Sequence, residues 1–256
     1  DSLALLGNSS EFARAVRWCE ENLSFDVDET VSLFETNIRA LGGLLSAHLF
    51  ALSPGLGLMP DYSGRLLSLA TDLADRLLPA FDTPTGIPFG SVNLRHGVNA
   101  NEARVTCTAA AGTLALEFGS LSRLTGDPKY ERVAKRAAIA VWNYRSSHDL
   151  LGAHINIDKG AWTQADAGVG RGIDSFYEYM LKAHLLFGDA DYLAIFHDAY
   201  RAALRHLKHG SWYVDAHTIT TQMTWPLFNS LQCFWPGMQT MLGDVEMAVD
   251  TMRAFH

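Results

Sequence analysis

A short phrase recurs four times along this 256-residue chain and constrains its fold more than any other feature. In each copy a leucine is followed closely by glycine and then by asparagine or aspartate, at Leu6–Asn8, Leu124–Asp127, Leu186–Asp189 and Leu242–Asp244. Glycine can adopt the left-handed conformation that ends a helix, and the Asn or Asp after it can cap the next helix. Each copy therefore predicts the tight turn of a helical hairpin.

The spacing of these turns predicts a repeat of helical hairpins. The glycines Gly7, Gly126, Gly188 and Gly243 are 119, 62 and 55 residues apart. Because the first interval is about twice the others, we expect a degenerate repeat near 53–65, where Pro and Gly predict a longer loop. A closed ring of such hairpins needs about six or seven, and this chain supplies about four and a half. We therefore expect an all-α toroid that is incomplete in this chain.

Helical periodicity divides the helices into two classes. Helices that enter the Gly-Asp turns are apolar nearly all round, as in 41–44 and 108–112, which suits an inner ring packed on both sides. Helices that leave the turns are richer in charge and predict a solvent-facing outer ring. The long segments 83–105 and 146–172 are expected to be loops that carry the site, and 154–162 and 212–224 alternate like small β-hairpins.

Charge, hydropathy and cysteine spacing exclude several classes of protein. The formal net charge of -8 disfavours nucleic acid as a partner, because binding to phosphates needs Lys and Arg. No apolar stretch reaches the length of about 20 residues that a bilayer span requires. Cys19, Cys107 and Cys233 lie far apart without a zinc pattern, which leaves one disulfide and a free thiol open. The chain starts at Asp1 in a helical pattern, and we expect the domain to be truncated at both ends.

Two acidic residues open predicted inner helices. Glu35 lies in the first turn of one such helix among apolar neighbours and should be buried; an ion pair with Arg39 is the structural alternative. Asp174 opens another, with Glu178 one turn on, and a capping role is its structural alternative. The inner helices of a toroid all begin at one end, so we expect Glu35 and Asp174 in one cavity. Paired carboxylates there suggest glycoside hydrolysis.

The residues also resemble a known family. The stretches 31–48, 83–93, 121–127 and 174–179 are similar to glycoside hydrolase family 47, the calcium-dependent, inverting α-1,2-mannosidases. The segments 105–112 and 168–174 resemble its ER degradation-enhancing subgroup, because the classical enzymes carry a glutamate near Ala110 and an arginine near Gly172. The resemblance covers the whole chain. It implies an (α/α)7 toroid with small β-hairpins in its loops, of which residues 1–256 form a part.

The resemblance assigns roles to five residues. Glu35 is expected to be the general acid, acting through water, and Asp174 a second catalytic carboxylate. Arg39 is expected to support Glu35 and, with Asn93 and Glu178, to bind substrate. Calcium is the expected cofactor of the parent protein, but the family's calcium-binding threonine motif and its motif for the base do not occur here. We therefore expect no metal ligand in this chain, and the fragment alone to be inactive.

The resemblance also implies a cellular function. It predicts a mannosidase of the endoplasmic reticulum lumen that trims mannose from N-glycans of misfolded glycoproteins for ER-associated degradation. Oligomannose glycans are its expected partners, and an oxidoreductase of the protein disulfide isomerase type is a further one. The alternative is a non-catalytic, lectin-like protein of the same fold, since the differences at Ala110 and Gly172 alter the sugar-contacting wall. A third class, such as a sugar epimerase, would place histidines at the inner-helix openings, where this chain has Glu and Asp.

Overall fold

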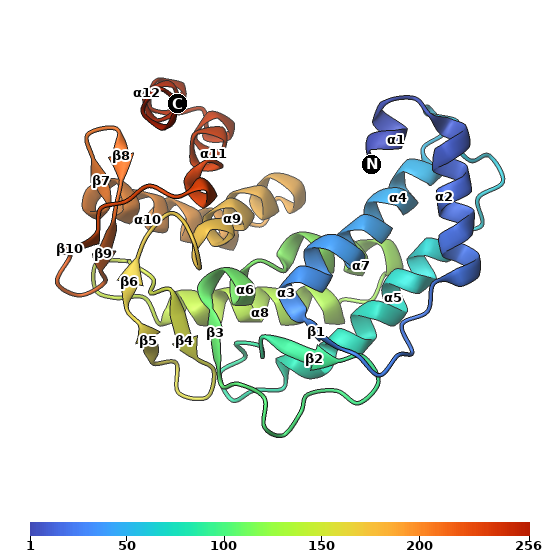
Figure 1. The fold of residues 1–256 in the computed structure, drawn as a ribbon, viewed down its shortest axis with the longest axis horizontal. Coiled ribbons are helices and arrows are strands. Elements are labelled where there is room, and N and C mark those ends of the chain that lie inside the picture. Colours follow the sequence, from blue (N-terminus) through green and yellow to red (C-terminus); the bar gives the residue numbers. More distant parts are fainter.

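The chain forms an open arc of helices in two layers, with its two termini on opposite sides of the opening (Figure 1). The structure is a computed structural model that describes residues 1–256. The helices are α1 (Ser2–Leu5), α2 (Ser9–Asn22), α3 (Leu33–Glu35), the π-helix η1 (Thr36–Leu41), α4 (Gly42–Leu52), α5 (Arg65–Leu77), the 3-10 helix η2 (Leu78–Phe81), α6 (Thr108–Gly112), α7 (Ala115–Thr125), α8 (Lys129–Asn143), α9 (Asp174–Phe187), α10 (Ala190–His206), the 3-10 helix η3 (Ser230–Gln232), α11 (Trp235–Leu242) and α12 (Val245–Phe255).

The strands are short and lie in the loops. They are β1 (Thr30–Ser32), β2 (Ser91–Asn93), β3 (Val105–Cys107), β4 (His154–Asn156), β5 (Trp162–Gln164), β6 (Asp166–Ala167), β7 (Lys208–His209), β8 (Trp212–Tyr213), β9 (Asp215–His217) and β10 (Met223–Trp225). They form four antiparallel sheets in the orders β1-β2, β3-β4-β5, β10-β9-β6 and β7-β8. Strands therefore form in both segments, 154–162 and 212–224, in which hairpins are predicted.

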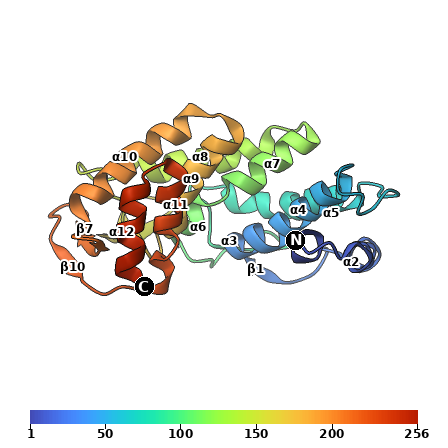
Figure 2. The same ribbon diagram turned by 90° about the horizontal axis from the view of Figure 1, so that it is seen from above.

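The helices pair as the repeat predicts. α4 packs on α5, α7 on α8, α9 on α10 and α11 on α12, while α4, α7, α9 and α11 also contact one another in that order. Seen from above, these pairs follow one another around an open curve (Figure 2). The first helix of each pair thus belongs to an inner layer and the second to an outer layer. The longer connection expected in the degenerate repeat is the loop from 53 to 64 between α4 and α5.

The four repeated turns owe their shape to glycine. Gly7, Gly126, Gly188 and Gly243 all have a left-handed φ, between +73° and +91°, which residues with a Cβ adopt only at a cost. The side chains of Asn8 and Asp189 accept backbone N–H groups of the next helix, as expected. Asp244 does not cap α12. Its carboxylate instead accepts a hydrogen bond from the hydroxyl of Tyr200, a residue of α10, at 2.8 Å.

The outer helices are buried on one face. The inner helices are buried only in part, and some of their apolar side chains remain exposed. The predicted core face of α10 is buried throughout: Tyr192, Ile195, Phe196, Ala199 and Ala203. The expectation that inner helices are covered on all sides is wrong for this chain, since Leu49, Leu185 and Met241 are about half exposed. In an open arc, each inner helix is covered by its outer partner and its inner neighbours, and the rest of its surface stays uncovered.

A glycine sets the spacing between the inner helices α6 and α9. A Cβ at Gly112 would lie 2.3 Å from Cδ2 of Phe176, whose ring is fully buried. We expect Gly112→Ala to lower the free energy of unfolding by about 1–3 kcal/mol, because a ring in the core cannot move aside freely. Urea unfolding measures it. The matched control is Gly43→Ala in α4, where nothing lies within 4 Å, and alanine there should be neutral or stabilise by up to about 1 kcal/mol. Equal midpoints for the two variants would contradict the prediction.

Candidate functional site

Three inner-layer helices begin side by side. β1 runs directly into α3 and β3 directly into α6, while α9 follows the glycine-rich segment after β6. α6 contacts α3 on one side and α9 on the other. The backbone N–H of Ala109, in the first turn of α6, donates to the carbonyl of Gly172 at 2.9 Å, which ties this turn to the segment that leads into α9. The helices that carry Glu35 and Asp174 therefore flank α6.

Glu35 is held at the start of α3 but is not buried. Its backbone N–H donates to Oγ of Ser32, and its Oε2 accepts Nε of Arg39 at 2.5 Å. The Glu35 side chain is 49% exposed, so the expectation of burial is wrong. The reason is the helix face: Leu33 and Asn37 point into the core, and Glu35 projects from the other side. The ion pair with Arg39 forms as predicted, and its exposure makes it a weak contributor to stability.

Asp174 lies deeper in the protein than Glu35. Its Oδ1 accepts the backbone N–H of Ser175 at 2.8 Å. Burial raises the pKa of Asp174, the hydrogen bonds from Ser175 oppose this, and the nearby Glu178 carboxylate raises it further. The side chain thus bonds its direct neighbour in sequence. Asp174 therefore retains a proton to a higher pH than an exposed aspartate does.

The start of α6 carries a cysteine. Sγ of Cys107 accepts the backbone N–H of Ala110 at 3.3 Å and so caps the helix. Burial raises the pKa of the Cys107 thiol, and the Asp174 carboxylate adds to this effect. Cys107 is therefore a protonated capping group close to Asp174. All three cysteines are free, so the disulfide that the sequence leaves open is absent from the structure.

Two further residues predicted to contact substrate have partners within the protein. Oε1 of Glu178 accepts Nζ of Lys182 at 2.6 Å. The Asn93 amide donates to Asp28, and its oxygen accepts the backbone N–H groups of Arg95 and His96. Asn93 thus shapes the loop after β2, and its role in binding a sugar stays a prediction. No hydrogen bond or ion pair joins Glu35 directly to Asp174 in the structure.

Glu117, a half-buried residue of α7, belongs to the site although its sequence pattern was not interpreted that way. Its two carboxylate oxygens accept side chains from η1 and from α9, the elements that follow Glu35 and contain Asp174. The signal for it is present in the sequence, because Glu117 is the one acidic residue in Ala115–Thr125, the helix that enters the turn at Gly126. An isolated acid among apolar neighbours in such a helix needs a partner.

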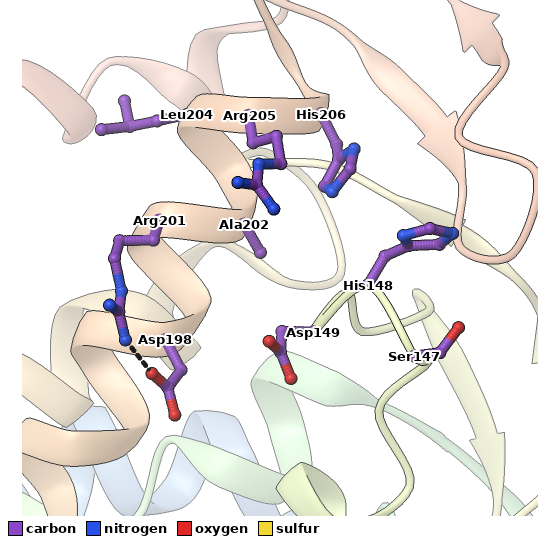
Figure 3. A pocket seen from close by; sticks show the side chains of 9 residues that line it. All are labelled: Ser147, His148, Asp149, Asp198, Arg201, Ala202, Leu204, Arg205 and His206. Atoms are coloured by element: carbon purple, nitrogen blue, oxygen red, sulfur yellow. Dashed lines mark hydrogen bonds and ion pairs between the residues drawn. The ribbon is translucent and has the colours of Figure 1, made fainter.

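A pocket lies at the outer layer. This pocket of about 720 Å³ is formed by Ser147, His148 and Asp149 of the α8–β4 loop and by the last turns of α10 (Figure 3). There the rings of His148 and His206 meet edge to face, 5.0 Å between centroids. Burial lowers the pKa of His206, and its neighbours His148 and Arg205 lower it further. None of the predicted site residues lines this pocket, so it is separate from the candidate site.

Calcium does not fit the residues of this chain. No group of three or more His, Cys, Asp or Glu side chains is arranged to hold a metal ion. The acids at the helix openings instead pair with Arg39, Ser175 and Lys182.

None of the helices combines the length and the apolar character that crossing a bilayer requires.

Comparison with known proteins gives a consistent result. The model of glycosyl hydrolase family 47 matches residues 1–256. The chain is 57% identical over 256 residues to alpha-mannosidase I MNS4 of Arabidopsis thaliana, covering 100% of this chain and 41% of that protein. It is 45% identical over 259 residues to ER degradation-enhancing alpha-mannosidase-like protein 2 of Mus musculus, covering 100% of this chain and 45% of that protein. The chain thus spans less than half the length of these relatives.

A solved structure matches the fold. The α-1,2-mannosidase from Trichoderma reesei superposes with a TM-score of 0.87 at 27% sequence identity, over 98% of this chain and 55% of that one. This match confirms the α/α toroid that the helix pairing predicts, and the family match confirms the resemblance drawn from the motifs.

Proposed function

The chain belongs to glycosyl hydrolase family 47, and on that premise we propose that it forms part of a mannosidase that removes α-1,2-linked mannose with inversion. The substrate we propose is the oligomannose N-glycan of misfolded glycoproteins in the endoplasmic reticulum. The observation that carries the proposal is the pair of carboxylates, Glu35 and Asp174, on the two helices that flank α6. Inverting glycosidases work with two such groups that have room for water between them.

The surroundings of Glu35 fix its orientation and leave it accessible to substrate. The bond from Arg39 fixes one carboxylate oxygen, Oε2, and the side chain is exposed enough to meet a glycan. We propose that Glu35 passes its proton, through a water molecule, to the oxygen of the glycosidic bond that breaks, while a second water attacks the anomeric carbon from the opposite face and gives its proton to a base outside this chain. Geometry of this kind supports proton transfer to a leaving group at a fixed position.

The surroundings of Asp174 suit a second carboxylate at the same sugar. Its pKa is raised by burial, and the Ser175 N–H holds its orientation. We propose that Asp174 and Arg39 contact the reacting sugar, with Glu178 and Asn93 further along the glycan. The calcium of the family and the base that takes the proton of the attacking water would be held by residues other than those of this chain.

The proposed cellular setting is supported by the relatives. The Mus musculus relative is an ER degradation-enhancing alpha-mannosidase-like protein, and we propose the lumen of the endoplasmic reticulum for this protein. A disulfide isomerase-type oxidoreductase is a proposed partner. Cys233 is the exposed thiol of the three and is therefore the one most accessible to such a partner.

The proposal is tested by incubating the full-length protein that contains this chain with an oligomannose N-glycan ending in α-1,2-linked mannose. We expect release of free mannose that is first the β-anomer, because one displacement inverts the α-linkage. Proton NMR resolves the anomers as they form. Glycan binding without mannose release would select the lectin-like alternative, and neither binding nor release would overturn both functions.

A further inference from the structure

Glu117 joins the helical elements that carry Glu35 and Asp174. Its Oε2 accepts Nδ2 of Asn37 at 2.8 Å, and its Oε1 accepts the hydroxyl of Tyr179 at 2.6 Å. Asn37 lies in the π-helix η1, two residues after Glu35, and Tyr179 lies in α9, five residues after Asp174. One carboxylate on α7 thus binds a side chain from η1 and a side chain from α9.

The carboxylate of Glu117 is a costly group to place there. Burial raises the pKa of Glu117, and the hydrogen bonds from Tyr179 and Asn37, in that order, oppose this rise together with the backbone N–H of Glu117 itself. Both partners are uncharged donors, so no cation compensates the buried charge. The pKa of Tyr179 is raised by its own burial and by Glu117, so its hydroxyl keeps the proton that it donates. An apolar pair of the same volume would often stabilise the fold as well or better.

Further polar contacts run from Asn37 toward Asp174. The Asn37 side chain is fully buried, and its Nδ2 also lies 3.4 Å from the carbonyl oxygen of Thr113. Oγ1 of Thr113 lies 2.9 Å from Oγ of Ser175, the residue whose N–H holds the Asp174 carboxylate. Thr113 follows the last residue of α6, at the break before α7. The network therefore reaches α9 at two residues, Tyr179 and Ser175, of which Ser175 contacts Asp174 directly.

We propose that Glu117 is a positioning residue that fixes the placement of Glu35 relative to Asp174. Glu117 does not itself act on the sugar in this proposal; it acts through Asn37 and Tyr179. The inference rests on the proposed function, in which those two carboxylates serve one sugar. A misplacement of about 1 Å in such a pair can lower the rate about 100-fold. A rigid hydrogen-bonded link between the helices would therefore favour catalysis even where it lowers stability.

The test exchanges the two groups of the hydrogen bond. Glu117→Gln keeps the shape of the side chain but replaces one of its two oxygens by an NH₂ group. When the remaining oxygen accepts the Tyr179 hydroxyl, this NH₂ group faces the NH₂ group of Asn37, and two donors meet. The double variant Asn37→Asp with Glu117→Gln restores one donor and one acceptor at this contact and also the net charge, and it gives up the longer hydrogen bond, 3.4 Å, from Asn37 to the Thr113 carbonyl. Mannose release by the full-length protein is measured for the wild type, for each single variant and for the double variant.

We expect Glu117→Gln to lower kcat by about 10- to 100-fold with KM changed less than about threefold, and the double variant to recover at least about tenfold of that loss. Glu131→Gln is the matched control, because Glu131 pairs with Arg123 on the same hairpin and contacts neither flanking helix. It should leave kcat unchanged. A wild-type kcat in Glu117→Gln, or a loss that the double variant does not recover, overturns the proposal.

A second measurement separates this proposal from the proposed function. Amide hydrogen exchange in residues 33–39 and 174–178 reports on the two helix starts whether or not mannose is released. We expect Glu117→Gln to speed exchange in both segments, and the double variant to slow it again. If the wild type releases no mannose, the proposed function fails, but the exchange data still test whether Glu117 holds the two helix starts in place. Unchanged exchange in both segments overturns that role of Glu117.

Discussion

Replacement of Glu35 by glutamine is expected to lower kcat for mannose release by about 10²- to 10⁴-fold, the range for loss of a general acid. The amide cannot supply a proton, yet its oxygen can still accept Nε of Arg39, so the local structure is preserved. The exposure of the Glu35 side chain, 49%, means that the substitution disturbs no packed core. Release of free mannose from an oligomannose N-glycan by the full-length protein measures the effect.

A matched control and a second substrate make this prediction specific. Glu11→Gln changes another exposed glutamate that pairs with an arginine one turn on, Arg14, and should leave mannose release unchanged. α-Mannosyl fluoride has a leaving group that needs little protonation, so Glu35→Gln should lose at least about tenfold less rate on it than on the glycan. Equal losses on both substrates would show that Glu35 positions or binds the sugar and does not protonate the leaving group.

The turns of this fold could be predicted from sequence because their cause is local. A left-handed φ needs glycine wherever the turn occurs, so Gly126, Gly188 and Gly243 mark hairpins without any knowledge of the rest. The error at Asp244 has the opposite cause. Its carboxylate accepts a hydrogen bond from Tyr200 of another hairpin, and the sequence of one turn does not indicate which distant side chain will contact it in the folded chain.

The candidate site could be predicted only in part. The positions of Glu35 and Asp174 at the starts of inner helices follow from the repeat, and the structure agrees with them. The exposure of Glu35 depends on which face of a three-residue helix packs on α6, and that is decided by contacts between helices far apart in sequence. The role of Glu117 could not be predicted because it depends on two hydrogen-bond donors, Asn37 and Tyr179, that only the folded chain brings together.

Trp235 anchors the last hairpin of the arc to the helix that carries Asp174. It is fully buried at the start of α11, and its ring lies 5.1 Å from Tyr177, 5.2 Å from Tyr213 and 5.6 Å from Tyr200, measured between centroids. These tyrosines come from α9, β8 and α10. A single indole thus fills the space where three elements meet, and no neighbouring side chain can replace it without moving an element.

We expect Trp235→Ala to lower the free energy of unfolding by about 3–5 kcal/mol, as for other large-to-small changes in packed cores. Urea denaturation followed by circular dichroism measures the loss. The control is Trp225→Ala in β10, which removes a side chain that is 55% exposed and should change stability by less than about 0.5 kcal/mol. A loss at Trp235 as small as the loss at Trp225 would mean that the aromatic cluster relaxes around the cavity. Because Tyr177 lies three residues after Asp174 in α9, a large loss would instead show that the inner layer near the site depends on packing from the end of the arc.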